Sequence, residues 1–224
     1  MATHLDLEEQ EQLDQLKHFW RRYGNLITSV LLVASLALVG WQGWQWWQRD
    51  QASKAAGMFD ELERAVQASD VARATKVSEE LQSRYGSTAF AEQGTLLAAR
   101  LQYDKDQKDA ARKSLAWAVE HAKEDEYRLL ARLRLAGVLM DDGKHDEALA
   151  QLPADPPKAF AALVADRRGD VLQAQGKNAE AVRAYQSAYE QMDAGLDYRR
   201  LIEAKLIGLG AAPAPATAAS GSAS

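Results

Sequence analysis

Hydrophobic residues follow two patterns along the chain. From Asn25 to Trp47 the sequence NLITSVLLVASLALVGWQGWQWW runs without a charged residue. From residue 52 to residue 210, apolar residues recur every three or four positions with polar residues between them, a spacing typical of amphipathic helices. The β-branched alternation of strands is absent. The pattern predicts an all-α chain with one apolar helix followed by a series of amphipathic helices.

The apolar run is long enough to span a membrane. At about 1.5 Å per residue a helix over 25–47 crosses the roughly 30 Å hydrocarbon core of a bilayer. A buried core helix of a soluble protein is the alternative, but such helices are usually shorter. Aromatic and basic residues at both ends are typical of the two lipid–water interfaces. The predicted interfacial anchors are Trp20, Arg21, Arg22, Tyr23, Trp41, Trp44, Trp46 and Trp47.

Charges on either side of the span predict its orientation. Lys17, Arg21 and Arg22 precede it, whereas Arg49 and Lys54 follow it. More basic residues on one side favour the cytoplasm for that side, so residues 1–24 are expected in the cytoplasm and the rest across the membrane. A cleaved signal peptide would instead release a soluble protein that starts near residue 53. The run ends in tryptophans and not in a small-residue cleavage site, which favours a retained anchor.

Turn-forming residues divide the remainder into helices. Serine, aspartate, glycine and proline cluster at short intervals between the amphipathic segments. Short connections predict antiparallel neighbours. The expected helices cover about 53–69, 71–85, 88–105, 107–123, 125–142, 144–152, 156–176, 178–194 and 197–209.

These helices form repeats. The clearest copy lies in residues 163–192, where small and bulky residues occupy the positions of a tetratricopeptide repeat. Two weaker copies precede it, and the marker alanines Ala111, Ala148 and Ala181 show a period of 37 and then 33 residues. An irregular alanine-rich bundle is the alternative. The spacing predicts a tetratricopeptide-like α-solenoid over 53–210, marked by Ala99, Ala111, Leu115 and Ala118, by Ala136, Leu139, Gly143, Ala148 and Leu152, and by Gly169, Leu172, Gly176, Ala181, Tyr185 and Ala188.

Composition excludes several classes of protein. The net charge of -5 is spread over mixed acidic and basic residues, without the clustered positive charge that nucleic acid requires. The chain has no cysteine, so neither disulfides nor thiolate sites are possible. The tail at 211–224, AAPAPATAASGSAS, is expected to be disordered. The acidic residues of the N-terminal segment are interpreted as a solvated face, with a docking segment for a basic partner as the alternative.

No catalytic, cofactor-binding or metal-binding residues are predicted. His4, His18, His121 and His145 stand apart from one another and from any metal-binding spacing. The nucleophile and phosphate-loop motifs of enzymes are absent. An enzyme whose site is assembled from residues distant in sequence is the remaining catalytic alternative.

Surface recognition is therefore the predicted activity. Stacked helix pairs form an array whose inner face, built by the first helix of each pair, is the usual place to hold an extended peptide or a partner helix. The repeat places mixed polar and apolar residues on that face. The predicted contact residues are Arg100, Tyr103, Leu133, Met140, Asp166, Asp170 and Gln173.

Several segments in a fixed order resemble the YfgM family. They are the neck LKHFWRRYGN, the aromatic end GWQGWQWW, YGSTAFAEQGTLLAARL at 85–101, LRLAGVLMDDGKHDEAL at 133–149 and LVADRRGDVLQAQGKNAEAVRAY at 163–185. The resemblance covers residues 13–210. It implies a tetratricopeptide-like protein of the Gram-negative inner membrane, with a periplasmic helical domain associated with the SecYEG translocon and the chaperone PpiD. It carries no catalytic motif.

The expected protein is thus a single-pass, inner-membrane scaffold or chaperone that assists exported proteins, and not an enzyme. A tether beside the channel exit raises the local concentration of a weak binding groove, so that modest affinity for unfolded segments suffices. A membrane-anchored adaptor for a different envelope complex or regulator is the alternative. In that case a pull-down of this protein from detergent extracts would recover other partners and little SecY.

Overall fold

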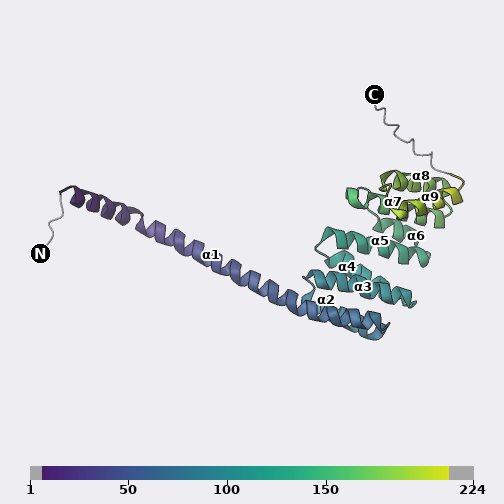
Figure 1. Cartoon of the computed structure of the whole chain (residues 1–224), viewed down its shortest axis with the longest axis horizontal. Coiled ribbons are helices and arrows are strands. Elements are labelled where there is room, and N and C mark those ends of the chain that lie inside the picture. The colour runs from purple at the N-terminus through teal and green to yellow at the C-terminus, as the bar shows by residue number, and fades with distance from the viewer. Residues whose placement is uncertain (1–6, 212–224) are drawn as a thin grey trace, which may run out of the picture. The chain divides into compact units, whose positions relative to one another are not determined.

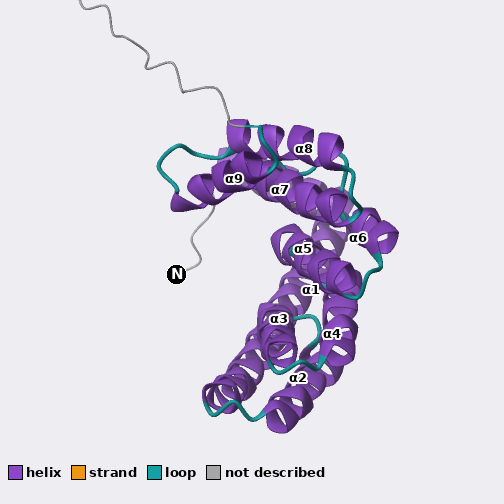
Figure 2. Ribbon diagram, turned by 90° about the vertical axis from the view of Figure 1, so that its right-hand side faces the viewer, coloured by secondary structure: helices purple, strands orange, loops and turns teal. Residues whose placement is uncertain are grey.

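The structure, a computed structural model, describes residues 7–211. Over this range the chain folds into helices connected by short turns, with no strand (Figures 1 and 2). The all-α prediction is confirmed. The helices are α1 (Leu7–Gln67), α2 (Val71–Tyr85), α3 (Ala89–Asp104), α4 (Lys108–His121), α5 (Asp125–Asp141), α6 (His145–Gln151), α7 (Lys158–Ala174), α8 (Asn178–Gln191) and α9 (Asp197–Gly208).

Helix α1 has no break after the tryptophan cluster. The expectation of a short connection and a new helix near residue 53 was wrong, because α1 continues to Gln67. Residues 48–56 are mostly good helix formers without proline, and Gly57 alone costs a helix only about 1 kcal/mol. By internal contacts the chain divides into two compact units with a boundary between Ser53 and Lys54.

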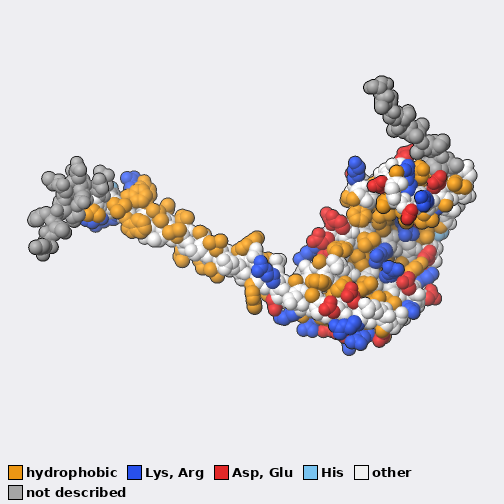
Figure 3. All heavy atoms as spheres, viewed as in Figure 1, with side chains coloured by type: hydrophobic (Ala, Val, Ile, Leu, Met, Phe, Trp, Pro, Cys, Tyr) orange, Lys and Arg blue, Asp and Glu red, His pale blue; other side chains and the backbone are white. Residues whose placement is uncertain are grey.

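The first unit consists of the N-terminal part of α1. Its apolar side chains are exposed along the helix (Figure 3), including Leu36 and Val39, which are 64% and 68% exposed. The hydroxyl of Thr28 donates to the carbonyl of Gly24 at 2.8 Å, so this polar group is satisfied within the helix, as an apolar surrounding requires. By length and composition α1 can cross a membrane. These properties fit a membrane anchor.

The second unit is an array of helix pairs. The end of α1 packs with α2, and α3–α4, α5–α6 and α7–α8 follow as further pairs, with α9 closing the array. Figure 2 shows α3, α5 and α7 on one side and α4, α6 and α8 on the other. The first helix of one pair also contacts the first helix of the next, since α3 contacts α5 and α5 contacts α7. The sequence pattern predicted the helices that form the α1–α2 pair but did not identify them as a repeat.

The repeat positions predicted from sequence form the core of this array. Ala111, Ala148 and Ala181 are completely buried, and the other marker residues are buried as well except the turn glycines Gly143 and Gly176, which are exposed. Gly169 lies directly under the ring of Tyr185, whose Cδ1 would be 2.5 Å from an added Cβ. Small residues therefore let α7 and α8 approach closely enough for the tyrosine ring to cover the glycine.

The first helix of each pair, and α9, ends in the same backbone conformation. One residue adopts a positive φ, its amide donates to the carbonyl three residues back, and the next amide donates to the carbonyl five residues back. Glycine supplies this conformation at no steric cost, but two of the positions hold other residues. In chain order the left-handed residues are Ser69, Asp106, Gly143, Gly176 and Gly210. The copy that lacks the turn glycine in sequence thus makes the same turn with Asp106.

This shared turn gives the first testable prediction. Asp106→Gly is expected to raise the free energy of unfolding by about 0.5–1 kcal/mol, because an L side chain in the left-handed region is strained. Gly176→Ala should lower it by about 1 kcal/mol for the same reason. Urea unfolding of the full chain in detergent, followed by pulse proteolysis, measures both changes. A stabilised Gly176→Ala variant would contradict the assignment of strain.

Candidate binding groove on the inner helix face

A groove lies on the side of the array formed by the first helices of successive pairs. We name it the inner groove. It holds about 420 Å³. Helices α3, α5 and α7 supply most of its wall, and α4 supplies Leu115. The lining residues are Ala99, Arg100, Tyr103, Leu115, Arg134, Gly137, Val138, Met140, Asp141 and Arg167.

Tyr103 and Asp141 connect two helices at the inner groove. The Tyr103 hydroxyl donates to Oδ2 of Asp141, which joins the end of α3 to the end of α5. This hydrogen bond, followed by burial, raises the pKa of Tyr103 above its ordinary value. Tyr103 remains 39% exposed. Its ring is therefore held in place and still accessible to a partner.

The structure brings together three of the seven inner-face residues predicted from sequence. Arg100, Tyr103 and Met140 line the inner groove. Leu133 is 6% exposed and packs in the central hydrophobic core. Asp166, Asp170 and Gln173 instead bind groups on α8 and α9, as described below. The repeat assigned these residues to the correct helices, but it did not resolve which side of each helix a neighbour covers.

Sequence analysis missed two arginines of the groove. Arg134 on α5 and Arg167 on α7 are 33 residues apart and occupy the same repeat position. An added Cβ on Gly137 would lie 3.5 Å from Nη1 of Arg167, an ordinary contact distance, so the Arg167 guanidinium lies directly beside this glycine. A search for charged residues that recur at the repeat period would have found the pair.

A partly buried ionic network fixes α9 to the array. Nζ of Lys205 lies 2.8 and 2.9 Å from the two carboxylate oxygens of Asp166, and 2.6 Å from Oδ1 of Asp170. Asp166 is 2% exposed and also accepts a hydrogen bond of 2.7 Å from the hydroxyl of Tyr198. We name Asp166, Asp170, Tyr185, Tyr198 and Lys205 the cap network. Each buried charge in it has an opposite charge and hydrogen bonds, as burial requires.

The hydroxyls of Tyr185 and Tyr198 bind acceptors on α7. The Tyr185 hydroxyl lies 2.9 Å from Oδ1 of Asp170 and 2.8 Å from Oε1 of Gln173. Burial and the nearby negative charge of Asp170 raise the pKa of Tyr185, and burial and the hydrogen bond to Asp166 raise that of Tyr198. Both hydroxyls must stay protonated to donate.

The raised pKa values of Tyr185 and Tyr198 predict that the free energy of unfolding falls at alkaline pH. A folded-state pKa above the unfolded value means that the native state holds a proton that the unfolded chain releases. The stabilisation is therefore complete below the ordinary tyrosine pKa of about 10 and is lost as the pH rises above it. Urea unfolding between neutral pH and pH 11 should show this decline. Tyr198→Phe should reduce its slope, and an unchanged slope would contradict the assignment.

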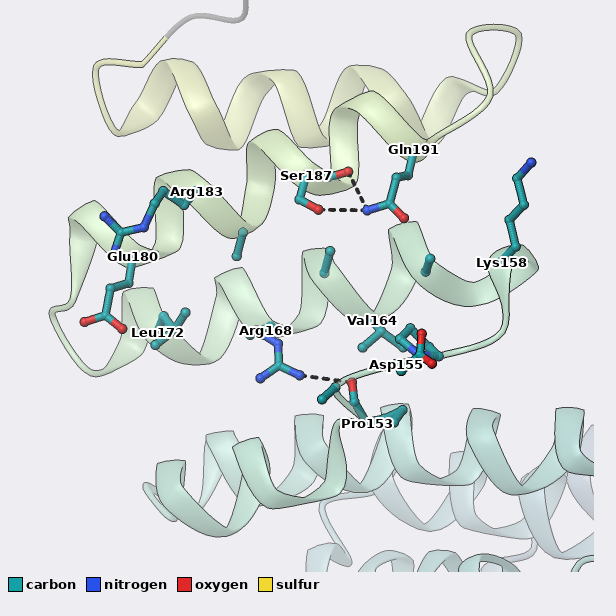
Figure 4. Close-up of a pocket in the computed structure, with 15 residues that line it drawn as sticks. Pro153, Asp155, Lys158, Val164, Arg168, Leu172, Glu180, Arg183, Ser187 and Gln191 are labelled. Carbon is teal, nitrogen blue, oxygen red and sulfur yellow. Dashed lines mark hydrogen bonds between the residues drawn. The ribbon is translucent and has the colours of Figure 1, made fainter.

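A second depression lies at the loop after α6 (Figure 4). It holds about 730 Å³ and is bordered by residues 153–158, α7 and α8. Helix α6 ends at Gln151, two residues before Pro153, which cannot continue a helix. The loop therefore lies where the second helix of the other pairs continues. Nη2 of Arg168 donates to the carbonyls of Leu152 and Pro153 at 3.2 and 3.1 Å. Figure 4 shows the arginine pointing at this loop, so its role is to hold the connection between α6 and α7.

Metal ligands do not gather in the part of the chain that the structure describes. Within residues 7–211 no group of three or more His, Cys, Asp or Glu could hold an ion. The inner groove offers cationic, hydrogen-bonding and apolar groups, a combination suited to binding a polypeptide.

Comparisons with known proteins agree with this architecture. Residues 17–211 match the family model of a tetratricopeptide repeat-like domain. A protein of Neisseria gonorrhoeae named ancillary SecYEG translocon subunit is 33% identical over 92% of this chain and 98% of its own length. Proteins of the same name from Haemophilus influenzae and Escherichia coli are 27% and 26% identical, over 82% and 80% of this chain and 90% and 86% of their own lengths. The resemblance noted in the sequence is confirmed, and the chain belongs to the tetratricopeptide repeat-like family of ancillary SecYEG translocon subunits.

Proposed function

We propose that this protein is a membrane-anchored accessory of the Sec translocon that holds polypeptide segments in the inner groove. The observation that carries the proposal is the match to proteins named ancillary SecYEG translocon subunits, which extends over nearly the whole chain and includes the apolar helix. The name of these relatives supports an accessory role at the translocon. Contact with PpiD and with unfolded exported proteins is the finer part of the proposal.

The anchor and its flanking charges support a defined topology. The apolar helix crosses the inner membrane, residues 1–24 lie in the cytoplasm, and the repeat domain at 53–210 lies in the periplasm. The exposed aromatic rings Trp20, Trp41, Trp44 and Trp46 occupy the two interfaces. The rings of Trp44 and Trp47 pack with centroids 5.2 Å apart at the second interface.

Alkaline phosphatase, which is active only after export, tests the topology. A fusion after Gly210 should be highly active, whereas a fluorescent protein at the same position should remain dark when exported through the Sec channel. The reverse pair of results would place the repeat domain in the cytoplasm and overturn the proposal.

Site-specific crosslinking tests the groove. A photoreactive amino acid at Tyr103 or Met140, both in the inner groove, should capture subunits of SecYEG, PpiD or exported chains. The same group at Gln173, which is exposed near the cap network, asks whether contact extends beyond the groove. Lys113, exposed on α4, is the matched control outside it. Equal capture from Lys113 and Tyr103, or capture of another envelope complex in place of SecYEG, would contradict the proposal.

A further inference from the structure

Three arginines from three successive first helices line the inner groove. They are Arg100 on α3, Arg134 on α5 and Arg167 on α7, and the one acidic residue among the lining side chains is Asp141. The Asp141 carboxylate already accepts the hydroxyl of Tyr103. The side chains that line the groove therefore carry more positive than negative charge, in a chain whose net charge is -5.

Arg134 has no acidic partner among the described residues. Its Nη1 donates to the backbone carbonyl of Leu96 at 3.0 Å. The side chain is partly buried, and burial, together with the positive charge of Arg100, lowers the pKa of Arg134. A bound anion would stabilise a partly buried guanidinium that lies beside a second cation.

The other two arginines of the groove make only long ion pairs. Nε of Arg100 lies 3.7 Å from Asp104, and Nη1 of Arg167 lies 3.5 Å from Asp170. Elsewhere in the array ion pairs are closer, for example 2.7 Å between Arg84 and Glu80. The groove guanidiniums thus keep most of their capacity to donate hydrogen bonds.

We propose that the inner groove binds the carboxylates of an acidic, extended polypeptide segment through Arg100, Arg134 and Arg167. This inference rests on the proposed function, in which the groove holds polypeptide. Planar guanidiniums donate two parallel hydrogen bonds to a carboxylate, which gives strength and orientation. Successive first helices each present one arginine, so an extended segment meets them in turn.

The remaining lining residues suit a polypeptide better than an isolated small anion. Leu115, Val138 and Met140 supply an apolar surface for the methylene groups and neighbouring side chains of the segment. The segment is recognised by acidic charge and flanking apolar groups together.

Fluorescence anisotropy with the full chain in detergent micelles tests this inference. The probes are a short labelled peptide of Glu, Leu, Ser and Ala with blocked ends, and its counterpart with Gln in place of each Glu. The Glu peptide should bind wild-type protein at least about tenfold more tightly than the Gln peptide, and added salt should reduce the difference. A Gln peptide with a free C-terminus shows whether a terminal carboxylate replaces the side-chain carboxylates.

Matched variants locate the binding site. Arg134→Gln and Arg167→Gln should each weaken binding of the Glu peptide about tenfold and leave the Gln peptide unchanged. Arg134→Gln also removes the hydrogen bond to the Leu96 carbonyl and could unfold the protein for that reason. Arg100→Gln avoids this problem, because the Arg100 side chain is 73% exposed, and it should weaken binding of the Glu peptide in the same way. Lys113→Gln removes an equal charge outside the groove and should have no effect.

The possible outcomes separate this inference from the proposed function. Equal binding of the two peptides, unaffected by the arginine variants, would overturn the preference for acidic segments and leave polypeptide binding intact. Failure of the wild-type protein to bind either peptide would overturn both.

Discussion

Replacing Lys205 with methionine is expected to lower the free energy of unfolding by about 3–5 kcal/mol. Methionine keeps most of the volume of the lysine stem but removes the ammonium that lies between Asp166 and Asp170. Asp166 would then be a buried carboxylate with only the hydroxyl of Tyr198 as a partner. Leaving one buried charge unpaired costs more than the pair contributes.

Hydrogen exchange of the full chain in detergent measures this effect locally. Amides of α9 in Lys205→Met should exchange at least about a hundredfold faster than in the wild type. Arg200→Met is the matched control, because Arg200 and Asp197 on the same helix are 85% and 96% exposed and their pair contributes little. Combining Lys205→Met with Asp166→Leu should restore much of the protection, since both charges are then removed together. Equal exchange in Lys205→Met and Arg200→Met would contradict the importance of the cap network.

Gly169→Ala is expected to destabilise the α7–α8 pair by about 1–3 kcal/mol, although alanine is the better helix former. The added methyl group would lie 2.5 Å from two ring carbons of Tyr185, which is too close without movement of the ring. That ring is 1% exposed, and its hydroxyl is hydrogen-bonded to Asp170 and Gln173. Moving it therefore disturbs packing and polar contacts together. Urea unfolding followed by pulse proteolysis measures the loss.

The other repeats suggest the compensating change. In the repeat formed by α3 and α4, Ala99 is equivalent to Gly169, and the smaller Leu115 is equivalent to Tyr185. The double variant Gly169→Ala with Tyr185→Leu should therefore regain part of the stability lost in Gly169→Ala. It should not regain all of it, because leucine cannot donate to Asp170. A double variant less stable than the sum of the two single changes would contradict this explanation.

The sequence predicted the helices well because their periodicity and turn residues are local signals. Gly143 and Gly176 mark the ends of α5 and α7 directly. The turn between α1 and α2 has Ser69 in place of the glycine, so the break was predicted there but the pair formed by the end of α1 and α2 was not recognised as a repeat. The break expected near residue 53 was wrong because polar composition marks a change of environment and does not by itself end a helix.

The candidate site was predicted less completely than the fold. Helical spacing placed Asp166 on the inner side of α7, and yet α9 covers it with Tyr198 and Lys205. Which of two neighbouring faces a later helix covers depends on tertiary packing between residues more than thirty positions apart. Arg134 and Arg167 were missed because a charged residue in an amphipathic helix is usually interpreted as solvent-facing.

The shortness of α6 has a mechanical consequence for the array. In a solenoid each element is stabilised mainly by its nearest neighbours, and α6 buries Ala148 as its one fully covered side chain. The helix pairs before and after this point are therefore coupled chiefly through α5 and α7. We expect this joint to bend more easily than the joints between the other pairs. Because Arg134 and Arg167 stand on opposite sides of that joint, small bending there changes the spacing between the two guanidiniums. Faster amide exchange in α6 than in α4 and α8 would be its signature.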